Sequence, residues 1–430
     1  MKVDTAELVD RIWSRDPTVW TGADEAQWLG WLDEPVRMLE RVDELLAFAT
    51  EVRAKRVCLL GMGGSSLAPE VMRRLFGVEH FSVLDTTHPD AVRRIDTEST
   101  LFIASSKSGS TIETRSQLDY FLDRGAVAVI VTDPGSPLEQ VGLRVFHGEP
   151  TIGGRYSALS MFGMLPAVLM GLDVRRLLER AEEMREACRL QEGNPGLELG
   201  IALGNGWREG RDKVLVVDDF GLWVEQLLAE STGKHGKGLV PVYDGDTPDV
   251  QKQEIRIPDP YELAQEFFRW EFATAVAGAI MEINPFDQPD VQAAKDKTNE
   301  VLARGEDPPL EPEGDVDELL ASARPGDYLF VQAFVDPARE AEVERICDRL
   351  RHAAGIPFAW GLGPRYLHST GQLHKGGPNT GIFVQVVDDL GEELPIPGQD
   401  FGFRRLIAAQ AAGDYEALKE RGRRVARIRL

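Results

Sequence analysis

The sequence predicts an α/β fold built on a doubly wound parallel sheet. Short apolar runs alternate with segments of helical length, and each run ends in small or polar residues. Strands are expected at 57–60, 81–84, 101–104, 126–132 and 144–146. Continuous apolar runs of this length are typical of strands buried on both faces of a sheet. Ligands of such sheets bind at the carboxyl ends of the strands.

Helices are expected between these strands at 67–76, 89–95 and 111–124. Residues 1–50 form a helical segment whose four tryptophans lie on an apolar face and serve packing. They are Trp13, Trp20, Trp28 and Trp31. We therefore expect a first domain over 51–200.

A strand at 213–217 is expected to begin a second domain over 201–430. Its helices are expected at 222–230, 261–283, 337–353 and 403–421, after a helical bridge at 174–190. The segment 305–315 is acidic and rich in proline, which predicts a linker or exposed loop. Beyond it, a C-terminal α/β extension is expected to contain strands at 328–331, 357–360, 381–387 and 425–430.

The composition limits the possible partners. The 430 residues carry 71 acidic against 48 basic side chains, a formal net charge of -23. Duplex nucleic acid and anionic membranes are therefore not expected partners. Three cysteines without metal-ligand spacing indicate free thiols in a reducing compartment. With no apolar leader segment and no membrane-spanning stretch, we expect a cytoplasmic protein.

The stretch LFIASSKSGSTIETR at 101–115 is the clearest candidate for a binding site. A buried strand leads through hydroxyl residues, Lys107 and Gly109 to a helix that begins near Thr111. Free N–H groups and the positive end of the helix dipole favour an anion there. A capping box of Ser110 and Glu113 is the alternative without a ligand. The spacing differs from that of a P-loop, so another kind of phosphate cradle is expected.

Two glycine-rich turns accompany this cradle. The first strand ends in GMGGSS, where Ser66 replaces the third glycine of a dinucleotide fingerprint, which disfavours a nucleotide-binding dehydrogenase. Instead, the turn is expected to lie beside the phosphate cradle. Arg155 follows two glycines in GGRYS, where the backbone can pack closely against a ligand.

Six short motifs resemble the phosphoglucose isomerase family: GMGGSSLAPE, SKSGSTIET, GGRYS, AESTGKHGKG, NPFDQPDVQAAK and LHSTGQ. The resemblance covers about residues 55–300 and the stretch around His368. RYLHSTGQLHKGGPNTG and the tail IPGQDFGF…AAQAAGDYEAL are most similar to the isomerase half of bacterial transaldolase–phosphoglucose isomerase fusions. The resemblance implies two sugar-isomerase domains, each a parallel sheet flanked by helices. It also implies reversible conversion of glucose 6-phosphate and fructose 6-phosphate, without redox cofactor or metal.

The resemblance assigns four catalytic residues. Glu230 is the base that transfers a proton through a cis-enediol, a role that suits a carboxylate whose pKa rises toward neutrality. Arg155 stabilises the enediolate oxygen. His368, assisted by Lys295, opens the sugar ring, because an imidazole can shuttle a proton near pH 7. His374, six residues later, is the competing candidate for the histidine.

The resemblance also assigns residues that bind the substrate. Gln226 and Glu230, four apart, and Gln288 and Lys295, seven apart, are each expected to share one helix face. Glu113 orients the histidine. The full substrate-binding set is Gly64, Ser65, Ser106, Lys107, Ser108, Thr111, Glu113, Gln226 and Gln288.

The chain departs from the family in the order of its motifs. The histidine motif follows both the glutamate and the lysine motifs, whereas in most of the family it lies between them. Asp290 occupies a position in the lysine motif that is usually small, which predicts a carboxylate near Lys295. The phosphate loop reads Ser-Gly-Ser-Thr at 108–111 where relatives often have two threonines, a change that keeps the hydroxyl at Thr111. Relatives are usually dimers that share the histidine, so a homodimer is expected, with the subunit that supplies His368 left open.

Two alternatives to a phosphoglucose isomerase stay open. One is an isomerase of dual specificity that also accepts mannose 6-phosphate. The other is a non-catalytic sensor of phosphosugars, which would need the phosphate loop but not Glu230, Arg155, Lys295 and His368 together. All four are present in the sequence.

Overall fold

The computed structural model describes residues 5–255, 257–305 and 307–430; for residues 5, 6 and 291–295 it describes the backbone alone. The first five strands form one parallel sheet in the order β2-β1-β3-β4-β5. They are β1 Arg56–Gly61, β2 Phe81–Leu84, β3 Thr100–Ser105, β4 Val127–Thr132 and β5 Arg144–His147. This confirms the predicted strands to within one or two residues.

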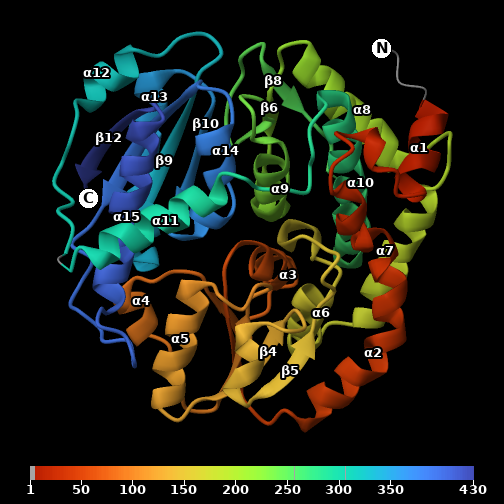
Figure 1. Cartoon of the computed structure of the whole chain (residues 1–430), viewed down its shortest axis with the longest axis horizontal. Coiled ribbons are helices and arrows are strands. Elements are labelled where there is room, and N and C mark those ends of the chain that lie inside the picture. Colours follow the sequence, from red (N-terminus) through yellow and green to blue (C-terminus); the bar gives the residue numbers. More distant parts are fainter. Residues whose placement is uncertain (1–4, 256, 306) are drawn as a thin grey trace.

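Helices cover this sheet in the lower part of Figure 1. They are α3 Leu67–Leu75, α4 Pro89–Arg93, α5 Ile112–Asp123 and α6 Met161–Leu169. In the register, Gly61 at the end of β1 lies opposite Ser105 at the end of β3. The two glycine- and serine-rich loops that follow these strands therefore leave the sheet side by side, at its carboxyl edge.

A further layer of helices lies against the right side in Figure 1: α1 Thr5–Trp13, α2 Glu34–Glu51, α7 Val174–Ala187, α8 Pro195–Arg208 and α10 Leu263–Met281. The N-terminal tryptophans pack here as expected, since Trp31 is buried and stacks on Tyr156 with ring centroids 5.4 Å apart. Helix α8 was not predicted. Among the described residues, no helix has the length and apolar character needed to cross a bilayer.

The second half contains two further groups of parallel strands. β6 Lys213–Leu215, β7 Val240–Val242 and β8 Val250–Lys252 have the order β7-β6-β8, and α9 Asp218–Thr232 follows β6. β9 Tyr328–Phe334, β10 Phe358–Leu362, β11 Gly381–Val387 and β12 Arg424–Arg429 have the order β10-β9-β11-β12. A short antiparallel bridge between Asp244 and Phe358 joins the two groups. The remaining helices are α11 Val291–Ala303, α12 Val316–Ala321, α13 Glu340–Ala354, α14 Gly371–Gly376 and α15 Phe403–Glu420.

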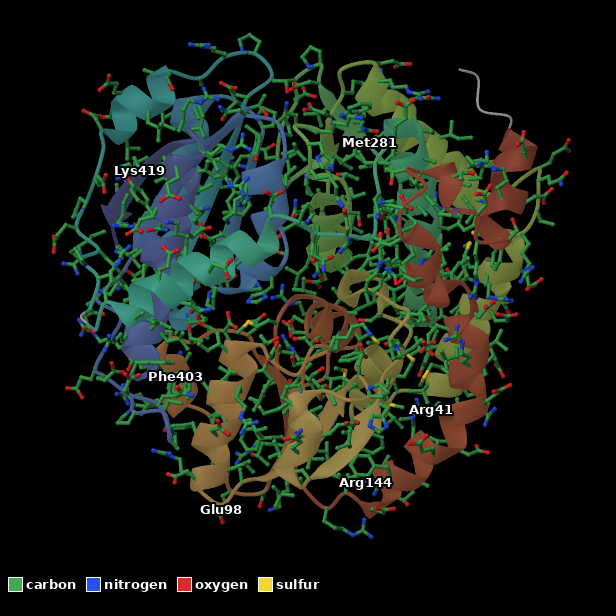
Figure 2. All side chains as sticks on the ribbon, viewed as in Figure 1. Arg41, Glu98, Arg144, Met281, Phe403 and Lys419 are labelled. Atoms are coloured by element: carbon green, nitrogen blue, oxygen red, sulfur yellow. The ribbon has the colours of Figure 1, made fainter. Side chains whose placement is uncertain are left out.

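Helix α15 connects the two halves. Its first residues, Phe403 and Leu406, belong to the apolar cluster of the first sheet, and Phe403 contacts Tyr120 of α5 edge-on. Ile407 and later residues pack against the four-stranded sheet. Figure 2 shows Phe403 beside the lower part of the molecule and Lys419 in the upper left part. The residues midway along α15 therefore lie between the two halves.

The close packing of α8 against α10 depends on glycines in α8. A methyl group built on Gly200 would lie 2.5 Å from Cβ of Val276 and 2.6 Å from the carbonyl of Ala273. Gly196 and Gly204, one turn away on either side, contact Phe272 and Ile280 in the same manner. We expect Gly200→Val to lower the free energy of unfolding by about 2 kcal/mol through overpacking.

Urea denaturation tests this expectation. Glu198 is exposed on the same helix, so Glu198→Val adds the same β-branched side chain without a clash and serves as the control. Equal effects of the two substitutions would contradict the close packing of α8 on α10.

Candidate active site

Glu113 and His368 come together from distant parts of the chain. His368, in the short 3₁₀ turn Arg365–His368, lies with Nε2 2.8 Å from Oε1 of Glu113 in the first turn of α5. The capping-box alternative is wrong, because Thr111 is the N-cap of α5 and makes no side-chain capping bond. The Glu113 side chain, which is buried, therefore contacts the histidine instead of closing the helix end.

The start of α5 borders a cavity of about 420 Å³. Gly109, Ser110, Thr111 and Glu113 line one side of it, and His368 lines another. Within the loop, the Ser106 hydroxyl donates to Oγ1 of Thr111 at 2.9 Å, and the Ser108 and Ser110 hydroxyls lie 3.0 Å apart. Hydroxyls and backbone N–H groups at a helix N-terminus are donors suited to a phosphate.

Lys107 occupies a different position from the loop hydroxyls. Its ammonium donates to both carboxylate oxygens of Asp133, at 2.8 and 2.7 Å, and to the Glu149 carbonyl at 2.7 Å. Burial lowers the pKa of Lys107, and the Asp133 carboxylate opposes that shift. In this conformation the lysine ties the loop to the segment after β4, and its role as a phosphate ligand stays a prediction.

The turn after β1 packs against the other site segments through its glycines. A methyl group on Gly64 would lie 2.1 Å from the Gly154 carbonyl. Gly63 has φ +52°, and a methyl group there would lie 2.4 Å from the His368 carbonyl. Ser65, the next predicted ligand, is buried in the same turn. The glycines thus allow three backbone segments to meet at one point.

Arg155 is a buried cation at the centre of the site. Nε donates to the Ser231 hydroxyl at 2.7 Å, and Nη1 donates to Oε1 of Gln288 at 2.7 Å. Nη2 donates to the carbonyls of Pro285 and Asp287 at 2.7 and 3.0 Å. Its side chain is 1% exposed. These bonds fix the guanidinium between α9 and the loop before α11.

Glu230 lies in the last turn of α9, where Oε1 is 3.4 Å from Nη1 of Arg155. Gln226 lies one turn earlier on the same face, as predicted, and donates from Nε2 to Oε2 of Glu230 at 2.9 Å. The same Nε2 also donates to the His368 carbonyl at 2.9 Å. One glutamine therefore links the carboxylate to the histidine segment.

Gln288 does not share a helix face with Lys295, so that prediction is wrong. Gln288 precedes α11, which begins at Val291. The cause is Pro289, because a residue before proline is disfavoured in helical conformation. The side chain of Lys295 lies outside the described residues. The carboxylate of Asp290 is 2.8 Å from both Nε2 of Gln372 and Nη2 of Arg421.

Sequence reasoning did not single out Lys234, although it stands in the AESTGK motif. Its buried ammonium donates to the carbonyls of Asn284 and Asp287, at 2.7 and 2.6 Å. Burial, followed by the nearby charge of Arg155, lowers its pKa to about 8. Lys234 and Arg155 therefore hold the same loop from two sides.

His374, the competing histidine, lies in the interior. Its ring is 1% exposed and packs between Phe330, Tyr366 and Phe383, at centroid distances of 4.2, 5.9 and 4.9 Å. Burial holds its pKa well below the usual value. Neither ring nitrogen hydrogen-bonds to any of the described residues. This environment suits packing, and it favours His368 for proton transfer.

The chain was compared with known proteins, and no family model matches it. A glucose-6-phosphate isomerase of Nostoc sp. is 33% identical over 276 residues, covering 54% of this chain and 50% of the relative. That of Carboxydothermus hydrogenoformans is 32% identical over 265 residues, covering 51% and 56%. The chain thus spans about half the length of the curated relatives it matches. These similarities confirm the resemblance that the motifs indicate.

A solved structure supports the fold. The glucose-6-phosphate isomerase of Chlamydia trachomatis aligns with a TM-score of 0.50 and 20% identity, covering 70% of this chain and 79% of that one. The predicted α/β class, with parallel sheets flanked by helices, is confirmed. The closer likeness to the isomerase half of fusion proteins stays a prediction.

Glu225, beside Gln226 on α9, is a second buried carboxylate that sequence reasoning missed. It accepts hydrogen bonds from the Tyr243 hydroxyl and, at 3.3 Å, from the hydroxyl of Ser369, next to His368. Burial raises the pKa of Glu225 to about 7, although the Tyr243 bond acts in the opposite direction. Glu225 is therefore placed to hold the histidine segment.

The raised pKa predicts a pH-dependent stability. Between about pH 4.5 and 7 the folded chain keeps a proton on Glu225 that the unfolded chain has lost. Because the folded chain binds this proton more tightly than the unfolded chain, the free energy of unfolding is highest below this range. It falls by up to about 3 kcal/mol as the pH rises through the range. Urea denaturation at several pH values should show this fall diminished in Glu225→Gln. Glu198→Gln, at an exposed position, should leave it unchanged; equal pH profiles for wild type and Glu225→Gln would contradict the assignment.

Proposed function

We propose that the chain catalyses the reversible isomerisation of glucose 6-phosphate and fructose 6-phosphate. One continuous set of contacts carries this proposal. Glu113 bonds to His368, the His368 carbonyl accepts from Gln226, and Gln226 donates to Glu230, which lies beside Arg155. Aldose–ketose isomerisation requires a proton-transfer base, a fixed cation and a ring-opening acid, and this set supplies all three within one site.

The substrate's phosphate is proposed to bind at the start of α5. Ser106, Ser108 and Thr111 would donate from their hydroxyls, with Gly64 and Ser65 beside them. The formal net charge of -23 repels an anion at long range. The helix N-terminus and the local donors must therefore provide the attraction.

Ring opening is the first proposed chemical step. The C1 hydroxyl loses a proton, the bond between C1 and the ring oxygen breaks, and the ring oxygen gains a proton. With Nε2 bonded to Glu113, His368 would exchange this proton through Nδ1. The Glu113 carboxylate stabilises the charged imidazole during the transfer. Lys295 is proposed to assist.

Proton transfer between carbons follows. Glu230 takes the proton from C2 of the open aldose, and the electron pair moves through the cis-enediolate onto O1. Arg155 stabilises that oxygen as a cation that needs no reorganisation. The carboxyl group returns the proton to C1, while the hydroxyl proton passes from O2 to O1. Substrate and product are isomers, so the reaction consumes no external oxidant or reductant. In the proposed mechanism Arg155 supplies the positive charge, and neither a metal nor a redox cofactor takes part.

The proposal includes the wider organisation. The chain would comprise the helical segment 1–50 and sugar-isomerase domains at 51–200 and 201–430, acting in the cytoplasm as a homodimer. His368 contacts Glu113 of its own chain, which supports a site that each subunit completes by itself. Mannose 6-phosphate stays an alternative substrate for the same chemistry.

The central test is conversion of fructose 6-phosphate to glucose 6-phosphate, measured through a coupled dehydrogenase. We expect Glu230→Gln to lower kcat by at least about 100-fold, because the amide cannot accept the C2 proton. Asp219→Asn, at an exposed position on the same helix, is the matched control and should retain wild-type activity.

Three other results have distinct meanings. If wild type binds fructose 6-phosphate but does not convert it, the chain is a phosphosugar sensor and not an isomerase. If Glu230→Gln stays active, the assignment of Glu230 as the base is wrong, but the proposed reaction is retained. Comparable turnover of mannose 6-phosphate would establish dual specificity.

A further inference from the structure

The carboxylate of Glu113 accepts a hydrogen bond from a second side chain besides that of His368. Nε2 of Gln410, midway along α15, donates to Oε1 of Glu113 at 2.6 Å. This is the same oxygen that lies 2.8 Å from Nε2 of His368. The Gln410 side chain is buried and 2% exposed, and it borders the same cavity as Glu113 and His368.

The orientation of the Gln410 amide follows from its two neighbours. Its Oε1 accepts from the hydroxyl of Thr87, which is fully buried, at 2.7 Å. A flipped amide would set its carbonyl oxygen against the Glu113 oxygen that also faces His368, and two acceptor oxygens repel each other. Thr87 and Glu113 thus fix both ends of the amide.

The position of Gln410 is a consequence of the fold. Helix α15 begins against the first sheet and continues along the four-stranded sheet. Gln410 is therefore a residue of the second half that reaches the carboxylate of the first half. It stands two turns after Phe403, between the part of α15 that packs against the first sheet and the part that packs against the four-stranded sheet.

We propose that Gln410 is a positioning residue for ring opening, acting through Glu113 on His368. This inference rests on the proposed function and deepens it. Two donors on one oxygen leave the carboxylate a single orientation, and that orientation sets the plane of the imidazole that faces the sugar. Removing an outer partner that orients a metal-bound histidine typically costs roughly 10- to 100-fold in affinity or activity, and we expect a loss at the lower end of that range for His368.

The role predicts a dependence on the form of the substrate. Fructose 6-phosphate is mostly cyclic and must be opened. 5-Deoxyfructose 6-phosphate has no hydroxyl at C5 and a phosphate on O6, so it cannot close a five- or six-membered ring. Its isomerisation still needs the base and the cation, but it does not need ring opening.

The experiment measures kcat and KM for both substrates. We expect Gln410→Leu to lower kcat/KM for fructose 6-phosphate by about 10-fold and to leave the value for the 5-deoxy compound within about 2-fold. Thr87→Val, which removes only the hydroxyl that holds the amide, should give a smaller loss with the same selectivity. If Gln410→Leu does not fold, Thr87→Val still tests the proposal, because it changes the orientation of the Gln410 amide without replacing Gln410.

Gln385→Leu is the matched control. Gln385 is a buried glutamine of β11 whose Nε2 donates to the Ala411 carbonyl on α15, at 3.0 Å. Its loss disturbs α15 beside Gln410 without touching Glu113. We expect a lower melting temperature and unchanged preference between the two substrates.

Each outcome decides the inference. Selective loss with the cyclic substrate supports it. Equal loss with both substrates in a folded variant, or no loss with either, overturns it while the proposed function stands. If wild type converts neither compound, the proposed reaction is wrong. If Glu230→Gln converts both compounds, the assignment of Glu230 as the base is wrong. In the first of these cases the role of Gln410 is overturned with it.

Discussion

The site depends on one buried positive charge that the fold must satisfy. The Arg155 guanidinium is buried away from water, so its N–H donors need acceptors within the protein. Ser231 of α9, Gln288 and two carbonyls of the loop before α11 provide them. Satisfying the arginine therefore aligns three segments, and the same alignment sets Glu230 beside it. The cation that stabilises the proposed enediolate is thus fixed before any substrate arrives.

His368 is held near Arg155 and Glu230 by contacts that its position in the sequence does not predict. Gln226 holds its carbonyl, Glu225 holds the neighbouring Ser369, and Glu113 holds its ring. The Gly63–Gly64 turn leaves room for that backbone. Although the histidine motif follows the glutamate and lysine motifs along the chain, it lies between Glu113 at the proposed phosphate site and Gln226 beside the proposed base. The order of motifs therefore differs from most of the family while the proposed chemistry is retained.

The sequence predicted the first sheet well, because each of its strands is a continuous apolar run. It missed β7 and β8, since three-residue strands carry too little pattern to recognise. Motifs indicated residues, such as Glu113 and His368, that the structure brings together, but not how each side chain is held. Lys107 is bound by Asp133, and Glu225 by Tyr243, through contacts that depend on the packing of separate segments. Pro289 was visible in the sequence, and its effect on Gln288 could have been foreseen.

Complementation between two inactive variants tests most directly whether one chain completes the site. Glu230→Gln and His368→Asn would be purified separately, then mixed in equal amounts, unfolded and refolded together, so that the two chains reassociate at random and half of any dimers contain one of each. The account predicts that the mixture stays as inactive as either variant, because every site contains one defect. Recovery of about a quarter of wild-type activity, as expected for a dimer that shares its histidines between subunits, would contradict it.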